Sequence, residues 1–373
     1  MTASGIGETT RILGRGSLAL ILILCCGELL VRLLIGGPSP QMYDPEIGYA
    51  YLPHSEQFQA TEGYARLRFN ALGLNDSEVA PRDGQCRVLV IGDSYTAALQ
   101  VPRESNFTSV AEQLDRRLDV VNAGRDGLFL GDMHKVFNRL AKGLRPDLVV
   151  YVLSQRAIEG DIQLPEFTLS LDPGTGAIRD AVMRVEEKES LKRIIAPLLG
   201  ESALATRLAA QLKPAVTDAL KQFTAWRDAL KPGRAAGAPA AGAPAAGPAV
   251  ARPSSEDVLT FLFRRFSAGT PTALLYLNAL QYQPEGRATA APLSNNAEAL
   301  ARRAAVRAEI RLFNTAGYLT DAMAQSRQPP YGFNNALRPG GHLNDEGHRA
   351  VGRALVDLVR EMGPALPREC AAK

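Results

Sequence analysis

The stretch that most constrains this chain runs from Arg87 to Tyr95 and reads RVLVIGDSY. A short, apolar and mostly β-branched run leads directly into Gly-Asp-Ser. Such a bounded run is typical of a strand buried on both faces. Gly92 allows a sharp turn at the end of that strand. Apolar residues at helical spacing then predict a helix from Thr96 to Leu118.

This arrangement puts Ser94 at the carboxyl end of a strand and at the start of a helix. Open α/β sheets bind their ligands at that edge, and the first N–H groups of a helix favour an oxyanion. Ser94 is therefore a candidate nucleophile. The alternative is that Asp93 and Ser94 only cap the helix, since both residue types are preferred caps.

Further strand and helix patterns follow in alternation, which predicts a parallel, doubly wound sheet. The expected strands are 118–121, 148–153, 272–277 and a weak fifth at 317–319. The expected helices are 133–144, 257–267, 295–314 and a last one through Ala350, Leu355 and Val359.

The N-terminal run from Ser17 to Gly37 is long and apolar enough to cross a bilayer as a helix. Arg11 and Arg15 precede it, and positive charge stays in the cytoplasm. We therefore expect residues 1–16 in the cytoplasm, a signal-anchor over 17–37, and the rest in the periplasm of a single-pass inner-membrane protein. A cleaved signal peptide and an amphipathic surface helix are the alternatives.

Composition divides the remaining chain. Residues 38–82 are rich in Pro, Gly and Tyr and are expected to wrap from the anchor onto the domain formed by 83–159 and 256–365. Residues 160–255 are expected to be an insertion at the rim of the sheet, with a hairpin over 167–185 and helical patterning over 191–230. The stretch 231–255 is almost entirely Ala, Gly and Pro, which predicts disorder.

Composition also excludes several function classes. The net charge of +3 and the lack of a basic run with aromatic residues argue against nucleic acid. Four cysteines and four histidines without ligand spacing predict no metal site. The turn after the Arg87 strand lacks Gly-x-Gly-x-x-Gly, so a dinucleotide is not expected and no cofactor is predicted. Cys86 and Cys370 could pair in an oxidising compartment.

Serine hydrolysis needs a base, and His342 is the best candidate. It lies in the loop GGHLNDEGH just before the last helix, from which a side chain can reach the carboxyl edge of the sheet. His348 falls within that helix, His134 on another helix and His54 in the wrapping segment. The alternative is that His342 only helps Asn344 and Asp345 to cap the helix.

Four blocks in this order resemble those of the SGNH/GDSL hydrolases: VLVIGDSY, VNAG, PDLVV and HLNDEGH. ELLVR at 28–32 and NALGL at 70–74 resemble the membrane-anchored bacterial members, and the match covers 43–156 and 272–359. The resemblance implies a flavodoxin-like α/β/α sandwich with a mostly parallel five-stranded sheet. It also implies ester hydrolysis through an acyl-serine, with Ser94 as nucleophile and oxyanion donor, Gly124 as a second N–H donor, and His342 as base and then acid.

Two positions depart from the pattern of this family. Its third block carries an Asn that donates to the oxyanion, whereas this chain has Gln155 and Arg156, either of which could donate instead. The triad acid usually stands two or three residues before the histidine, where this chain has Gly340 and Pro339. The imidazole would then be oriented by a backbone carbonyl, by an acid from elsewhere, or not at all.

Two functions fit these observations. The first is an ester hydrolase or O-acyl transferase acting outside the membrane on a small acyl ester or acylated cell-envelope carbohydrate. The second is a catalytically impaired protein of the same fold with a binding or assembly role in envelope polysaccharide metabolism.

Overall fold

The computed structural model describes residues 3–34, 41–44, 47–60, 62–155, 158, 167–172, 174–183, 202–205, 208, 253–266, 269–282, 290–292, 296–336 and 341–370. The chain forms two compact units. One comprises 1–39 and 186–249, and the other comprises 40–185 and 250–373.

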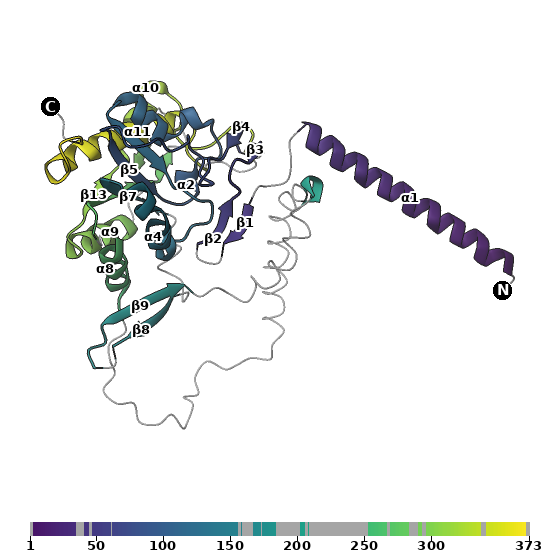
Figure 1. The fold of residues 1–373 in the computed structure, drawn as a ribbon, viewed down its shortest axis with the longest axis horizontal. Helices are drawn as coiled ribbons and strands as arrows, with labels where there is room; N and C mark the ends of the chain where they lie inside the picture. The colour runs from purple at the N-terminus through teal and green to yellow at the C-terminus, as the bar shows by residue number, and fades with distance from the viewer. Residues whose placement is uncertain are drawn as a thin grey trace. The chain divides into compact units, whose positions relative to one another are not determined.

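The larger unit is built on a parallel five-stranded sheet, visible in Figure 1. Its strands stand in the order β13-β10-β7-β5-β6, which in chain order is the 2-1-3-4-5 arrangement of flavodoxin-like folds read from the opposite edge. The flavodoxin-like sheet expected from the sequence is thus confirmed. The strands are β5 (Cys86–Ile91), β6 (Leu118–Asn122), β7 (Leu148–Ser154), β10 (Thr272–Leu277) and β13 (Arg311–Asn314).

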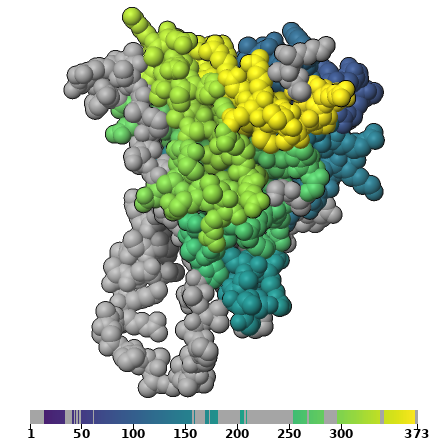
Figure 2. All heavy atoms as spheres, turned by 90° about the vertical axis from the view of Figure 1, so that its left-hand side faces the viewer, coloured from purple at the N-terminus to yellow at the C-terminus, as the bar shows by residue number. Residues whose placement is uncertain are grey.

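Helices cover both faces of the sheet, which confirms the three-layer architecture. Alternate residues of β5 enter different cores: Leu89 and Ile91 pack on one face, Val88 and Val90 on the other. The first face carries α4 (Met133–Leu144), α8 (Ser255–Phe266) and α9 (Asn296–Arg307). The second carries α3 (Phe107–Leu114), α10 (Ala316–Ser326) and α11 (Asp345–Met362). Figure 2 shows α10 and α11 side by side, in light green and yellow.

The helix expected from Thr96 to Leu118 is wrong as a single element. Its first piece, α2 (Ser94–Ala97), ends where Ala98 adopts a left-handed conformation with φ of 51°. Pro102 and a 3₁₀ turn (Arg103–Ser105) follow, and α3 then starts behind a new cap, Asn106, whose side chain accepts from the Ser109 N–H at 2.8 Å. The residues before and after this break both have the apolar spacing of a helix. Pro102 was the one sign in the sequence that the helix is interrupted.

The fifth strand was also misplaced. The strand is Arg311–Asn314, and Gly317 to Leu319 belong to α10. Helix α9 ends at Arg307, and Glu309 turns the chain with φ of 56°. The Asn314 side chain then accepts from the Ala316 N–H at 2.7 Å and starts α10.

The wrapping segment forms two hairpins and a small core of its own. The hairpins are β1 (Gln41–Asp44) with β2 (Gly48–Tyr51), and β3 (Glu56–Gln59) with β4 (Ala65–Arg68). Tyr51 and Phe69 stack with ring centroids 4.1 Å apart. That core includes Ala97 and Leu99, which follow the Ser94 turn. The segment is thereby packed against the element that carries the candidate nucleophile.

Helix α1 (Ala3–Leu34) contains a stretch, Gly14–Leu33, with mean hydropathy 2.1, long and apolar enough to cross a membrane. Arg32 and Glu28 pair at 2.6 Å, as their spacing predicts. In the same unit the Glu28 carboxylate accepts from the N–H groups of Ala203 and Leu204, each at 2.8 Å.

Two shorter hairpins complete the larger unit. β8 (Phe167–Leu171) and β9 (Ile178–Met183) form the hairpin expected over 167–185. β11 (Leu280–Tyr282) pairs with β12 (Ala290–Pro292) after the end of β10. The helical pattern over 191–230 and the Ala/Gly/Pro stretch 231–255 lie almost entirely outside the described residues.

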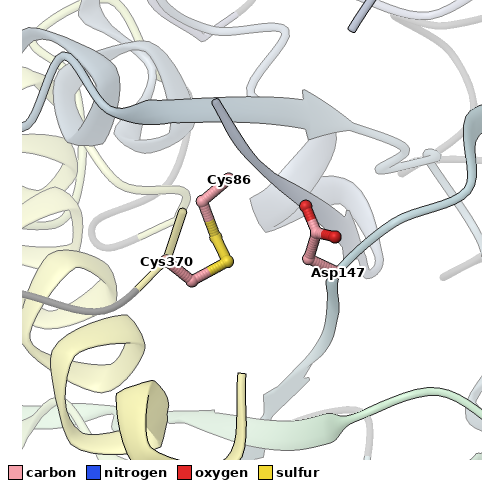
Figure 3. A group of neighbouring side chains, drawn as sticks. All are labelled: Cys86, Asp147 and Cys370. Atoms are coloured by element: carbon pink, nitrogen blue, oxygen red, sulfur yellow. A yellow bond between two sulfur atoms is a disulfide. The ribbon is translucent and has the colours of Figure 1, made fainter. Parts of the chain in front are cut away.

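A disulfide joins Cys86 to Cys370 and ties the C-terminal segment to the start of strand β5 (Figure 3). Their Cα atoms lie 4.8 Å apart and both residues are buried. Asp147 lies beside them, where its carboxylate accepts from the Arg87 N–H at 2.9 Å. Because the two sulfurs are bonded to each other, neither is a thiolate that could coordinate a metal ion.

We expect Cys370→Ser to lower the free energy of unfolding by about 2–5 kcal/mol, because the open chain gains freedom when unfolded. Thermal unfolding with and without reductant measures this: reductant should shift the parent protein to the variant's Tm. Cys25→Ser, at a free exposed cysteine, is the control and should change nothing. Equal Tm values for Cys370→Ser and the oxidised parent would contradict the prediction.

Candidate active site

Ser94 stands on a tight turn directly after β5. A side chain at Gly92 would place its Cβ 2.1 Å from Thr96 Oγ1 and 3.0 Å from Val152 Cβ, so the turn requires glycine. Asp93 caps α2 by accepting from the Tyr95 N–H at 3.0 Å and accepts a second bond from the Ser154 hydroxyl at 2.7 Å. These contacts hold Ser94 at the carboxyl edge of the sheet, where the sequence places it.

His342 meets Ser94 across 248 positions of sequence, with its Nε2 atom 2.8 Å from Ser94 Oγ. The Tyr95 ring packs against the imidazole at 4.9 Å between centroids. The residue that caps helix α11 is Asn344, whose side chain accepts from the N–H groups of Glu346 and Gly347. The His342 ring is therefore not needed as a cap. The imidazole is thus directed at the serine, which is the geometry a general base requires.

Glu62 supplies the carboxylate that the sequence pattern lacked. Its Oε2 atom lies 2.8 Å from His342 Nδ1, and its Oε1 accepts from the His342 backbone N–H at 2.6 Å. With Nδ1 donating to the carboxylate, Nε2 is left as the acceptor for the serine proton. Ser94, His342 and Glu62 therefore form a complete Ser–His–acid triad.

Sequence reasoning missed Glu62 because it lies 280 residues before the histidine, in the wrapping segment. The positions searched for an acid, Gly340 and Pro339, lie outside the described residues. One signal was present in the glycine before His342. Gly341 has φ of 120°, and a Cβ there would lie 2.0 Å from Glu62 Oε1, so the carboxylate occupies the space a side chain would need.

The turn that carries Glu62 is held by Asn335. The Asn335 side chain accepts from the Gly63 N–H at 2.9 Å and donates to the carbonyls of Ala60 and Gly63 at 3.0 and 2.9 Å. Gly63 has φ of 73°, and a Cβ there would lie 2.1 Å from the Gln100 carbonyl oxygen. The carboxylate is thus fixed through its backbone as well as through the imidazole.

The other three histidines have different surroundings. His348 is fully enclosed beside Phe107, and burial lowers its pKa to about 3, so it stays neutral. Burial also lowers the pKa of His134, whose ring contacts the Gly131 carbonyl at 2.8 Å. His54 faces Glu78 at 3.5 Å.

Burial raises the pKa of the Asp93 carboxyl, and the hydrogen bond from the Ser154 hydroxyl lowers it in part.

The backbone N–H groups expected to donate to the oxyanion differ in whether they already have a hydrogen-bond partner. The Ser94 N–H is not used in any hydrogen bond among the described residues, so it can donate to an oxyanion. The Gly124 N–H donates to Asn122 Oδ1 at 2.9 Å, so the role predicted for it would require that bond to break. Gly124 lets its backbone lie close to that of α2, because a Cβ at this position would lie 2.2 Å from the Ala97 nitrogen. Gln155 is buried at the end of β7, and Arg156 lies outside the described residues.

A small pocket of about 80 Å³ adjoins the triad. Tyr95 and Gly341, the chain neighbours of Ser94 and His342, form part of its wall, together with Ser154 and Gln155 at the end of β7. The rest of the lining is mostly apolar: Leu277, Ala279, Leu280, Tyr282 and Tyr331.

No family model matches the chain, and no curated protein is similar to it in sequence. Solved structures do resemble it. One is a lipolytic G-D-S-L family protein of Veillonella parvula, at 10% identity and TM-score 0.32, covering 73% of this chain and 97% of that one. Another is the esterase EstA of a Pseudoalteromonas species, at 13% and 0.35, covering 74% and 98%. A third is an acetylxylan esterase of Geobacillus stearothermophilus, at 12% and 0.37, covering 79% and 98%.

We expect Glu62→Gln to lower kcat for p-nitrophenyl acetate by about 10²–10⁴, because the amide can no longer hold the imidazole in the reactive tautomer. The matched control is Glu56→Gln on the neighbouring strand β3, whose carboxylate pairs loosely with Arg66 at 3.7 Å. Activity of Glu62→Gln within twofold of the parent would show that the carboxylate has no role in proton transfer.

We expect Asn335→Ala to lower kcat by about tenfold with little change in KM, because it acts only by positioning Glu62. A double-mutant cycle separates this from general destabilisation. In a Glu62→Gln background, Asn335→Ala should cost almost nothing further. A full tenfold loss in both backgrounds would indicate a structural role unrelated to the carboxylate.

Proposed function

We propose that this protein is a serine ester hydrolase that works through an acyl intermediate on Ser94. The observation that carries the proposal is the chain of contacts from Ser94 Oγ to His342 Nε2 and from His342 Nδ1 to Glu62 Oε2, each 2.8 Å long. The three groups come from separate parts of the chain and meet at one edge of the sheet.

The chemistry follows from this order of groups. His342 Nε2 takes the Ser94 hydroxyl proton as the oxygen attacks the ester carbonyl, and Glu62 stabilises the resulting imidazolium. The tetrahedral oxyanion accepts from the Ser94 N–H, and each such donor lowers the barrier by about 3 kcal/mol. The imidazolium then gives its proton to the departing alcohol, which leaves the acyl group on Ser94.

Water completes hydrolysis when His342 takes one of its protons as the oxygen attacks the acyl-serine. The imidazolium then returns that proton to Ser94 Oγ as the carboxylic acid leaves. A sugar hydroxyl in the place of water would make the protein an O-acyl transferase by the same steps. The non-catalytic alternative rested on the missing acid and on the altered Asn block. The contact of Glu62 with His342 speaks against the first of these grounds.

We place the enzyme on the outer face of the cytoplasmic membrane, anchored by α1. Arg11 and Arg15 before the apolar stretch favour this orientation. The Cys86–Cys370 disulfide supports it independently, since such bonds persist in oxidising compartments such as the bacterial periplasm. An acylated cell-envelope carbohydrate is the substrate class that this location would offer.

We expect a fluorophosphonate probe to label the purified full-length protein at Ser94, because the probe captures a serine whose proton a base can take. Ser94→Ala should abolish both the label and the turnover of short acyl esters. Ser109→Ala on α3 is the control and should retain both. Unchanged ester turnover in Ser94→Ala would sink the proposal. Tight carbohydrate binding without labelling or turnover would favour the binding role.

A further inference from the structure

We propose that the pocket beside the triad receives the acyl part of the substrate and admits only short chains, from acetyl to about butyryl. This inference rests on the proposed function, because it assigns the two halves of an ester to either side of Ser94. It goes further by naming the acyl group that the site selects.

The position of the pocket fits an acyl site. Its wall includes Tyr95 and Gly341, which are bonded in the chain to Ser94 and His342. Ser154 and Leu277 are register partners at the ends of β7 and β10, and both line it. The pocket therefore opens at the same carboxyl edge of the sheet as the reacting hydroxyl.

The chemistry of the wall decides which half of the ester can enter. Leucine side chains and tyrosine rings make up most of the surface. Most hydroxyl groups of a sugar would face this apolar surface without partners, because Ser154 and Gln155 are the only polar side chains among the described residues of the lining besides the tyrosines. An alkyl chain has no such groups and gains from leaving water. The acyl chain is therefore the half that fits, and the carbohydrate remains in the open.

The size of the pocket sets the length of the chain. Its volume is about 80 Å³. A cavity of about 150 Å³ in another protein binds benzene, a six-carbon ring. A pocket of roughly half that volume has room for two to four carbons.

The wall is held in place by contacts that resist widening. The Tyr95 hydroxyl donates to the Gly341 carbonyl at 3.3 Å, and the Tyr331 hydroxyl donates to the Asn278 carbonyl. The rings of Tyr95 and Tyr331 meet edge to face, with centroids 6.2 Å apart. Leu280 is 8% exposed and lies on β11, which is paired with β12. A longer chain would have to break several of these contacts.

The test is the dependence of kcat/KM on acyl length, measured with p-nitrophenyl acetate, butyrate and octanoate on the full-length protein. We expect similar values for acetate and butyrate and a fall of about tenfold or more for octanoate. Leu280→Ala removes part of the wall and should raise the octanoate-to-acetate ratio about tenfold. Ala279→Leu should fill the pocket and lower butyrate relative to acetate.

Leu300→Ala is the matched control, because it removes the same atoms from α9 on the other face of the sheet. It should leave all the ratios unchanged. If Leu280→Ala does not fold, Ala279→Leu and the chain-length profile of the parent still decide the question.

The outcomes separate this proposal from the one on which it rests. A flat or rising profile from acetate to octanoate, with Ser94 labelled by fluorophosphonate, would overturn the acyl pocket and leave the hydrolase standing. No labelling and no turnover of any ester would overturn both. Selective labelling by an ethyl over a decyl fluorophosphonate would support the pocket even if the enzyme turns over p-nitrophenyl esters only slowly.

Discussion

The Glu62 carboxylate makes two hydrogen bonds to one residue, and the site depends on both. One oxygen contacts the His342 ring and the other accepts from its backbone N–H. The first sets the tautomer of the imidazole, and the second fixes the loop from which the ring extends. Together they join the N-terminal wrapping segment to the C-terminal loop, whose His342 ring contacts Ser94.

The sheet could be predicted from sequence because its signals are local. Apolar runs over 88–91, 148–153 and 272–277 are buried strands whatever lies around them, and the Gly-Asp-Ser turn follows the first. The error in the fifth strand arose because the same spacing of apolar residues fits both a strand and a helix. Tyr318 and Leu319 belong to a helix although they read as a weak strand. The Asn314 side chain, which ends β13, accepts from the Ala316 N–H and turns the chain into α10, and this contact depends on the backbone around it.

Two of the three triad residues could be predicted from sequence, again because their signals are local. Ser94 and His342 stand next to glycine-rich turns that mark them in the sequence. Glu62 has no local mark, because its role comes from a contact with a loop at the other end of the chain. Gly341 carried an indirect sign, since a glycine with positive φ can leave space for a side chain from elsewhere. The oxyanion site was predicted less well, because the Gly124 N–H has a partner two residues away.

The position of Glu62 before the sheet limits how far the chain can be shortened from its N-terminal side. The apolar helix α1 comes first, the Glu62 carboxylate next, and the sheet only afterwards. A shortened descendant that begins at β5 would keep a whole sheet, its serine and its histidine, and would lose the acid. The leading segment can therefore be shortened only as far as Glu62 before the contact that orients the imidazole is lost.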